Sequence, residues 1–189
     1  MARNVDKGPV YLRAIRHIGD HVTRALERVD PQAVRRAVAL LNGAPSIFVY
    51  GAGRSGIIAR AFAMRLVQLG LRAYVIGETV TPIVRRGDAV FIVSNQGESY
   101  SSLQTANIVR REGAELIVLT AAPSSKLAHA ASVLLALDLQ DGRIHRAYAP
   151  LGTVFEAATL RLTDGLVAEL LQARGESEES MRRRHAIMV

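Results

Sequence analysis

The sequence predicts a three-layer α/β/α sandwich around a five-stranded parallel sheet, preceded by two N-terminal helices. Short runs of β-branched and aliphatic residues alternate along the chain with stretches of helical periodicity. These runs are continuously apolar, as expected for parallel strands that are buried on both faces. Two strand-to-helix connections are rich in glycine and serine, so we expect them to carry the chemistry.

Residues 1–44 are expected to carry the two helices. Apolar residues recur in them at three- and four-residue spacing, at Leu12, Ile15, Ile18 and Val22 and then at Val34, Ala37, Leu40 and Leu41. Between them, Asp30-Pro31 predicts a helix start, with Asp as the cap and Pro at the first helical position.

Residues 45–189 are expected to form the α/β core and a helical C-terminal tail. The predicted strands are 47–50, 73–76, 88–93, 116–119 and 133–137. Between and after them we expect helices at 57–69, up to about 111, after Ser125 and from about 153 to 171. No repeat or composition shift marks a boundary, so residues 1–189 are expected to be one domain.

Composition excludes several classes of protein. There is no cysteine, which excludes a disulfide framework, a thiolate nucleophile and a cysteine zinc site, and the histidines show no metal-ligand spacing. No apolar run approaches the ~18 residues of a membrane-spanning helix, and the N-terminus has no apolar signal core. We therefore expect a soluble, cytoplasmic protein that does not bind a membrane.

The net charge of +7 comes almost entirely from arginine, because only Lys7 and Lys126 are lysines. A basic chain suggests nucleic acid, but these arginines are spread along the sequence, aromatic residues are 5%, and no nucleic-acid-binding motif is present. We expect no nucleic-acid partner. The planar guanidinium also suits small phosphate esters.

The first candidate loop is residues 51–56 (GAGRSG), between a strand and a helix. It matches G-x-G-x-x-G, and Glu78 lies roughly where a ribose-binding acid would be in a dinucleotide site. A chain this short leaves no room for a separate substrate domain, and Arg54 and Ser55 favour a phosphate ester. A plain tight turn that needs glycine is the third interpretation.

The second candidate loop is residues 94–102 (SNQGESYSS). Small hydroxyl groups at a helix N-terminus can bind phosphate without any lysine. Ser99 or Ser101 could instead cap the following helix, but a cap requires one serine and this loop has four.

In this order, the two loops resemble those of the sugar isomerase (SIS) domain, which has a flavodoxin-like sheet. Three further segments, 77–82 (GETVTP), 149–156 (APLGTVFE) and 184–186 (RHA), resemble the 6-phospho-3-hexuloisomerases. The similarity extends from about Val10 to the C-terminus.

The resemblance implies an enzyme that interconverts D-arabino-3-hexulose 6-phosphate and fructose 6-phosphate through an enediolate, with no metal or redox cofactor. It implies a homo-oligomer, in this family a tetramer with active sites near subunit contacts, and a hexulose-6-phosphate synthase as pathway neighbour. The residues expected to bind the substrate and its phosphate are Gly53, Arg54, Ser55, Ser94, Asn95, Gln96, Gly97, Glu98 and Ser99.

By position, Glu156 matches the proposed general base of the family and His185 its C-terminal histidine. From spacing alone, Thr153-x-x-Glu156 is also a capping box at the start of a helix. Without the resemblance, a histidine near the C-terminus is ordinarily just solvated; with it, His185 would assist ring opening or carry a proton, in its own site or that of a neighbouring subunit.

One departure from the family pattern lies in the second loop. This chain has Asn95 and Gln96 where the family usually has glycine and serine. Two alternatives therefore stay open: an isomerase acting on sedoheptulose 7-phosphate or arabinose 5-phosphate, and a non-catalytic sensor of sugar phosphates.

Overall fold

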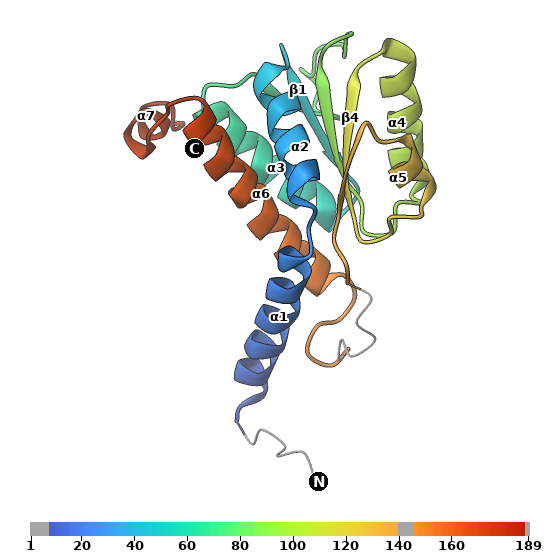
Figure 1. The fold of residues 1–189 in the computed structure, drawn as a ribbon, viewed down its shortest axis with the longest axis vertical. Coiled ribbons are helices and arrows are strands. Elements are labelled where there is room, and N and C mark those ends of the chain that lie inside the picture. Colours follow the sequence, from blue (N-terminus) through green and yellow to red (C-terminus); the bar gives the residue numbers. More distant parts are fainter. Residues whose placement is uncertain (1–7, 140–145, 188–189) are drawn as a thin grey trace.

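The computed structural model describes residues 8–139 and 146–187. Helices and strands alternate through most of this length, and one long helix near the C-terminus runs beside the N-terminal helices (Figure 1). Within the described ranges, no helix has both the length and the apolar character needed to cross a membrane.

Two helices precede the sheet, as predicted: α1 (Val10–Glu27) and α2 (Pro31–Gly43). The Asp30 carboxylate accepts a hydrogen bond from the Gln32 backbone N–H at 2.8 Å, so the predicted cap of α2 is confirmed. Helix α1 projects beyond the sheet and packs along the first half of α6 (Thr153–Ala173) (Figure 1).

The sheet has five parallel strands: β1 (Ile47–Gly51), β2 (Ala73–Val75), β3 (Ala89–Val93), β4 (Glu115–Thr120) and β5 (Val133–Ala136). Their order is β2-β1-β3-β4-β5, which confirms the predicted fold class. The register sets Gly51, at the end of β1, beside Val93, at the end of β3.

Helices cover both faces of the sheet, so the strands are apolar along their whole length. On one face α2, α3 (Arg54–Gln68) and α6 pack on side chains such as Phe91 and Ile117. On the other, α4 (Tyr100–Glu112) and α5 (Lys126–Ala130) pack on side chains such as Ile92 and Val118. Helix α7 (Glu178–Arg183) follows α6.

The strand order creates a crevice at one edge of the sheet. Strands β1 and β3 are neighbours, but the chain after β1 enters α3 on one face and the chain after β3 enters α4 on the other. Ligands of such sheets bind where the connections diverge in this way, beyond the carboxyl ends of the strands. Both candidate loops leave the sheet at this point.

The turn from β1 into α3 depends on contact between two backbone segments. A Cβ on Gly56 would lie 2.4 Å from the carbonyl oxygen of Gly51, so no residue with a side chain fits there without a shift of the backbone. Our prediction that the helix begins at residue 57 was wrong. It begins at Arg54, because Gly53, with φ of 58°, turns the chain directly into the first helical turn.

Replacing Gly56 by alanine should destabilise the protein by several kcal/mol, because the new methyl group would overlap backbone that cannot move independently. Gly165→Ala is the matched control: it lies inside α6 with no atom near its would-be Cβ, so it should stabilise by about 0.5–1 kcal/mol. Urea unfolding of both variants measures the difference. Equal stability of the two variants would contradict the close contact.

Candidate active site

A pocket of about 300 Å³ lies between the two loops at the sheet edge. The β1–α3 connection contributes Ala52 and Ser55, and the loop after β3 forms the opposite wall with Ser94, Asn95, Gln96, Glu98 and Ser99. The structure therefore brings together most of the residues predicted to bind phosphate. The first turns of α3 and α4 begin here, and helix N-termini favour anions.

Two serines of this pocket also hold the loop in shape. The Ser94 hydroxyl accepts a hydrogen bond from the Gly97 N–H at 3.2 Å. The Ser99 hydroxyl caps α4, accepting from the Ser102 N–H at 3.4 Å and donating to the Ser102 hydroxyl at 2.6 Å. The capping interpretation is thus confirmed for Ser99, and because Ser99 still lines the pocket, capping and ligand binding are compatible.

Gly97 and Glu98 of this loop are held in place by contacts with the residues at the start of α5. Gly97 has φ of 64°, and a Cβ there would lie 2.0 Å from the Ser125 hydroxyl oxygen, so glycine is required. The Glu98 carboxylate accepts a hydrogen bond from the Lys126 backbone N–H at 3.0 Å. Glu98 therefore ties the loop to the start of α5, in addition to lining the pocket.

Glu156 lies in the first turn of α6, with its side chain 14% exposed and ion-paired with the Nη2 atom of Arg54. The pair opens on a second pocket of about 420 Å³, whose walls include Ile57 and Leu160. Since Ser55 lines the first pocket and Arg54 the second, the first turn of α3 connects the two.

The predicted capping box at the start of α6 is wrong. The N-cap is Gly152, without a side-chain cap, and the Thr153 hydroxyl donates instead to the Pro150 carbonyl at 2.6 Å. Thr153 already lies inside the helix, so its hydroxyl cannot serve the N–H group of Glu156. The carboxylate of Glu156 is consequently directed at Arg54 and not used to cap the helix.

His185 lies far from Glu156 within one chain. Glu156 is in the first turn of α6 and His185 follows α7, beyond the other end of that helix (Figure 1). The intervening length of α6 alone is about 25 Å at 1.5 Å per residue. The exposed His185 borders a pocket of about 200 Å³ with Met64 and Val67, near the end of α3. One subunit therefore does not bring the two predicted catalytic residues together.

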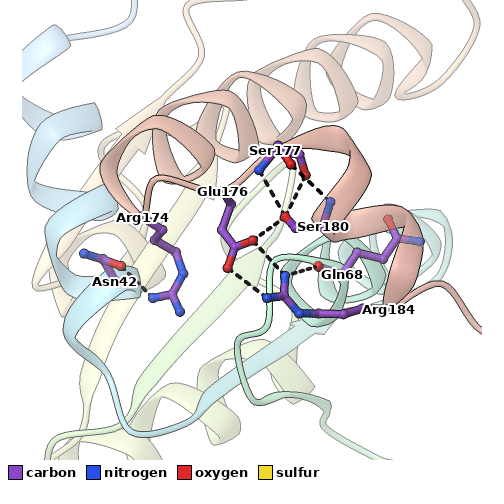
Figure 2. Close-up of polar contacts among 7 residues, drawn as sticks. All are labelled: Asn42, Gln68, Arg174, Glu176, Ser177, Ser180 and Arg184. Carbon is purple, nitrogen blue, oxygen red and sulfur yellow. Dashed lines mark hydrogen bonds and ion pairs between the residues drawn. The ribbon is translucent and has the colours of Figure 1, made fainter.

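Arg184 anchors the C-terminal segment that carries His185 (Figure 2). Its guanidinium binds both carboxylate oxygens of Glu176, at 2.9 and 3.0 Å, and donates to the Gln68 carbonyl at 3.2 Å. The Ser180 hydroxyl also contacts Glu176. These hydrogen bonds, with Arg184 contributing most, lower the pKa of Glu176 to about 2.

The sequence did not reveal this anchor. Arg182 and Arg183 pair with Glu178 and Glu179 one turn away, so most of the basic run is a solvated helix face, as its spacing indicates. Arg184 differs only because the chain turns back against α3, which local spacing does not encode.

The family model described as the SIS domain matches residues 40–161. A Bacillus subtilis (strain 168) relative named 3-hexulose-6-phosphate isomerase is 34% identical over 145 residues, covering 74% of this chain and 78% of its own. A Methylomonas aminofaciens relative of the same name is 32% identical over 153 residues, covering 80% of this chain and 84% of its own. The chain belongs to the SIS-domain family.

Within that family the resemblance noted from the sequence is confirmed, since the name of these relatives describes the reaction of the 6-phospho-3-hexuloisomerases. A solved Methanococcus jannaschii protein, interpreted from its structure as a 3-hexulose-6-phosphate isomerase, superposes with a TM-score of 0.84 at 25% identity. The alignment covers 94% of this chain and 99% of that one.

Replacing Glu176 by glutamine should reduce stability in a pH-dependent way. Because the pKa of Glu176 is lowered from 4.5 to about 2, its ion pair stabilises the fold fully above about pH 4.5, and the contribution is lost as the pH falls toward 2. The difference between wild type and Glu176→Gln in urea unfolding should therefore be largest at pH 7 and shrink below pH 4.5.

Glu179→Gln is the control, because Glu179 pairs with Arg183 on an exposed helix face. It should change stability little at either pH. A Glu176→Gln difference that is the same at pH 3 and pH 7 would contradict the role of the ionised carboxylate.

Proposed function

We propose that this protein is a sugar-phosphate isomerase that interconverts D-arabino-3-hexulose 6-phosphate and fructose 6-phosphate. The observation that carries the proposal is the placement of Glu156 beside Arg54, next to a serine-lined pocket at the carboxyl edge of the sheet. The named relatives support the reaction.

In this proposal the first pocket binds the phosphate. Ser55, Ser94 and Ser99 present hydroxyl groups, Gln96 presents an amide, and two helices begin at the pocket. Gly53 and Gly97 give the loops their shape, and Glu98 fixes one loop to α5. Binding at this end places the carbon chain of the sugar toward Arg54 and Glu156.

The carboxylate of Glu156 then acts as the general base. It removes the proton from C2 of the 3-ketose, the C–H electron pair forms the C2=C3 double bond, and the carbonyl electron pair moves to O3. Return of the proton to C3, with loss of the O2 proton and protonation of O3, gives the 2-ketose. The proton exchange between O2 and O3 requires a carrier, which is the role proposed for His185.

Because Glu156 and His185 lie far apart in one chain, we propose that this carrier comes from a second copy of the chain. The surface between the two ends has the character of an interface, because Ile57, Met64 and Val67 on α3 and Leu160 on α6 are all exposed. We propose a homo-oligomer, a tetramer as in the family, in which His185 of one subunit serves the Glu156 of another. A cytoplasmic location and a hexulose-6-phosphate synthase as pathway neighbour complete the proposal.

A second candidate follows from the departure at Asn95 and Gln96. Larger amides replace the small residues expected at the loop, which changes the space available to the substrate. A different sugar phosphate, such as sedoheptulose 7-phosphate or arabinose 5-phosphate, is therefore assayed in parallel, and fructose 6-phosphate binding without turnover would support a sensor.

Glu156→Gln should lower kcat by at least about 10³-fold, since it keeps the shape of the side chain but removes the base. The assay generates 3-hexulose 6-phosphate in situ and measures fructose 6-phosphate. Thermal unfolding and circular dichroism check that the variant stays folded. Near-normal turnover of a folded Glu156→Gln would refute the proposed base.

Mixing two inactive variants tests the shared site. If His185 acts on a neighbouring subunit, Glu156→Gln and His185→Ala subunits that exchange should recover up to about a quarter of wild-type activity, because hybrid pairs contain one intact site. Each variant re-assembled alone is the control. No recovery from hybrids verified by native mass spectrometry would show that the two residues do not form one site across subunits.

A further inference from the structure

The amide of Asn95 and the carboxylate of Glu156 converge above the backbone of Gly152. A Cβ built on Gly152 would lie 3.4 Å from Oε1 of Glu156 and 3.5 Å from Nδ2 of Asn95. These two side chains come from different segments, the loop after β3 and the first turn of α6, and the glycine lies between them. A substrate atom above Gly152 would have a base on one side and an N–H donor on the other.

The missing side chain at Gly152 matters for space and not for backbone conformation. Its φ of −96° is open to any residue, so no left-handed turn demands glycine here. What the glycine provides is room between the amide and the carboxylate. This room lies where the segment 149–152 enters α6, beside the predicted base.

The backbone that carries the Asn95 amide is held firmly. The Asn95 carbonyl oxygen accepts hydrogen bonds from the Thr120 hydroxyl and the Ala121 N–H, each at 3.1 Å. The Thr120 hydroxyl in turn accepts from the Ala122 N–H at 3.1 Å. The backbone at Asn95 is therefore fixed between two strand ends, which limits how far the amide must reorganise to donate to a developing charge.

We propose that Asn95 is a catalytic residue of this isomerase, whose Nδ2 donates a hydrogen bond to the enediolate oxygen that forms beside the carbon deprotonated by Glu156. The inference rests on the proposed function and adds a donor to it. As the C2 proton moves to Glu156, negative charge develops on O3. The amide supplies a hydrogen bond and no proton, so the proton carrier remains a separate group.

The proposal divides the second loop between two tasks. Gln96 lines the pocket assigned to the phosphate and is the more exposed of the two amides. Asn95 also borders that pocket, but its Nδ2 reaches the Gly152 side, where the base lies. Losing the Gln96 amide should therefore weaken substrate binding, whereas losing the Asn95 amide should slow the chemical step.

Asn95→Ala should lower kcat by about 10²-fold, as expected for removal of one donor to a developing oxyanion, with KM changed less than about threefold. Asn95→Asp, of the same shape but without the donor and with a negative charge beside the enediolate, should lose more activity than Asn95→Ala. Gln96→Ala is the contrasting variant, in which KM should rise and kcat should change little. A raised KM with unchanged kcat in Asn95→Ala would overturn the proposal.

Binding provides a readout that does not depend on turnover. In 4-phospho-D-erythronohydroxamate the hydroxamate group imitates the planar enediolate, while fructose 6-phosphate imitates the ground state. By calorimetry, Asn95→Ala should lose at least about tenfold more affinity for the hydroxamate than for fructose 6-phosphate. Equal losses for the two ligands would overturn the role of Asn95.

The turnover and binding experiments together separate this inference from the proposed function. If the wild type turns over neither 3-hexulose 6-phosphate nor the other sugar phosphates assayed, the proposed isomerase function is refuted. If the wild type is active and Asn95→Ala is fully active too, only the proposed role of Asn95 as donor is refuted. A wild type that binds the hydroxamate no more tightly than fructose 6-phosphate refutes the enediolate site altogether.

Discussion

The site depends on the pairing of β1 with β3. Because these parallel strands are neighbours, with Gly51 beside Val93, the two loops leave the sheet at one place and then diverge to opposite faces. Hydrogen bonding between the strands thereby fixes the distance between Ser55 and the second candidate loop, residues 94–102. The loop residues need only adopt local turns, which glycine and serine favour.

Helix α6 sets the second constraint. It is 21 residues long, with the proposed base in its first turn and the anchored C-terminal segment beyond its last. A rigid helix of this length keeps Glu156 and His185 apart in one subunit. The anchor made by Arg184, Glu176 and Gln68 then holds His185 on the outside of α3, among apolar side chains that remain exposed in the single chain. These two features are the basis of the proposed site shared between two copies of the chain.

Several residues combine structural and binding tasks. Ser99 caps α4 and Ser94 accepts a bond from within its own loop, yet both line the pocket. A hydroxyl oxygen has two lone pairs and one proton. Ser94 uses one lone pair within its loop and keeps its proton for a ligand, whereas Ser99 uses one lone pair and its proton on Ser102 and keeps the other lone pair. Capping and binding are therefore not competing explanations of such serines. At Glu156, by contrast, capping and catalysis were competing interpretations. The structure excludes the capping box, because Thr153 lies inside the helix and is not its N-cap.

The sequence by itself determined the sheet, the order of elements and the two loops, because apolar runs, Asp30-Pro31 and the glycines act through local backbone preferences. Through its resemblance to the 6-phospho-3-hexuloisomerases, the sequence also pointed to Glu156 and to the loop at residues 94–102. The start of one helix was predicted wrongly: α3 begins at Arg54 because Gly53, with φ of 58°, turns the chain directly into the first helical turn. Only the tertiary structure decided that Arg54 pairs with Glu156, that Asn95 faces Gly152, and that His185 lies beyond the far end of α6. These relations join residues distant in sequence, and they arise from how helices pack on the sheet, which no local pattern records.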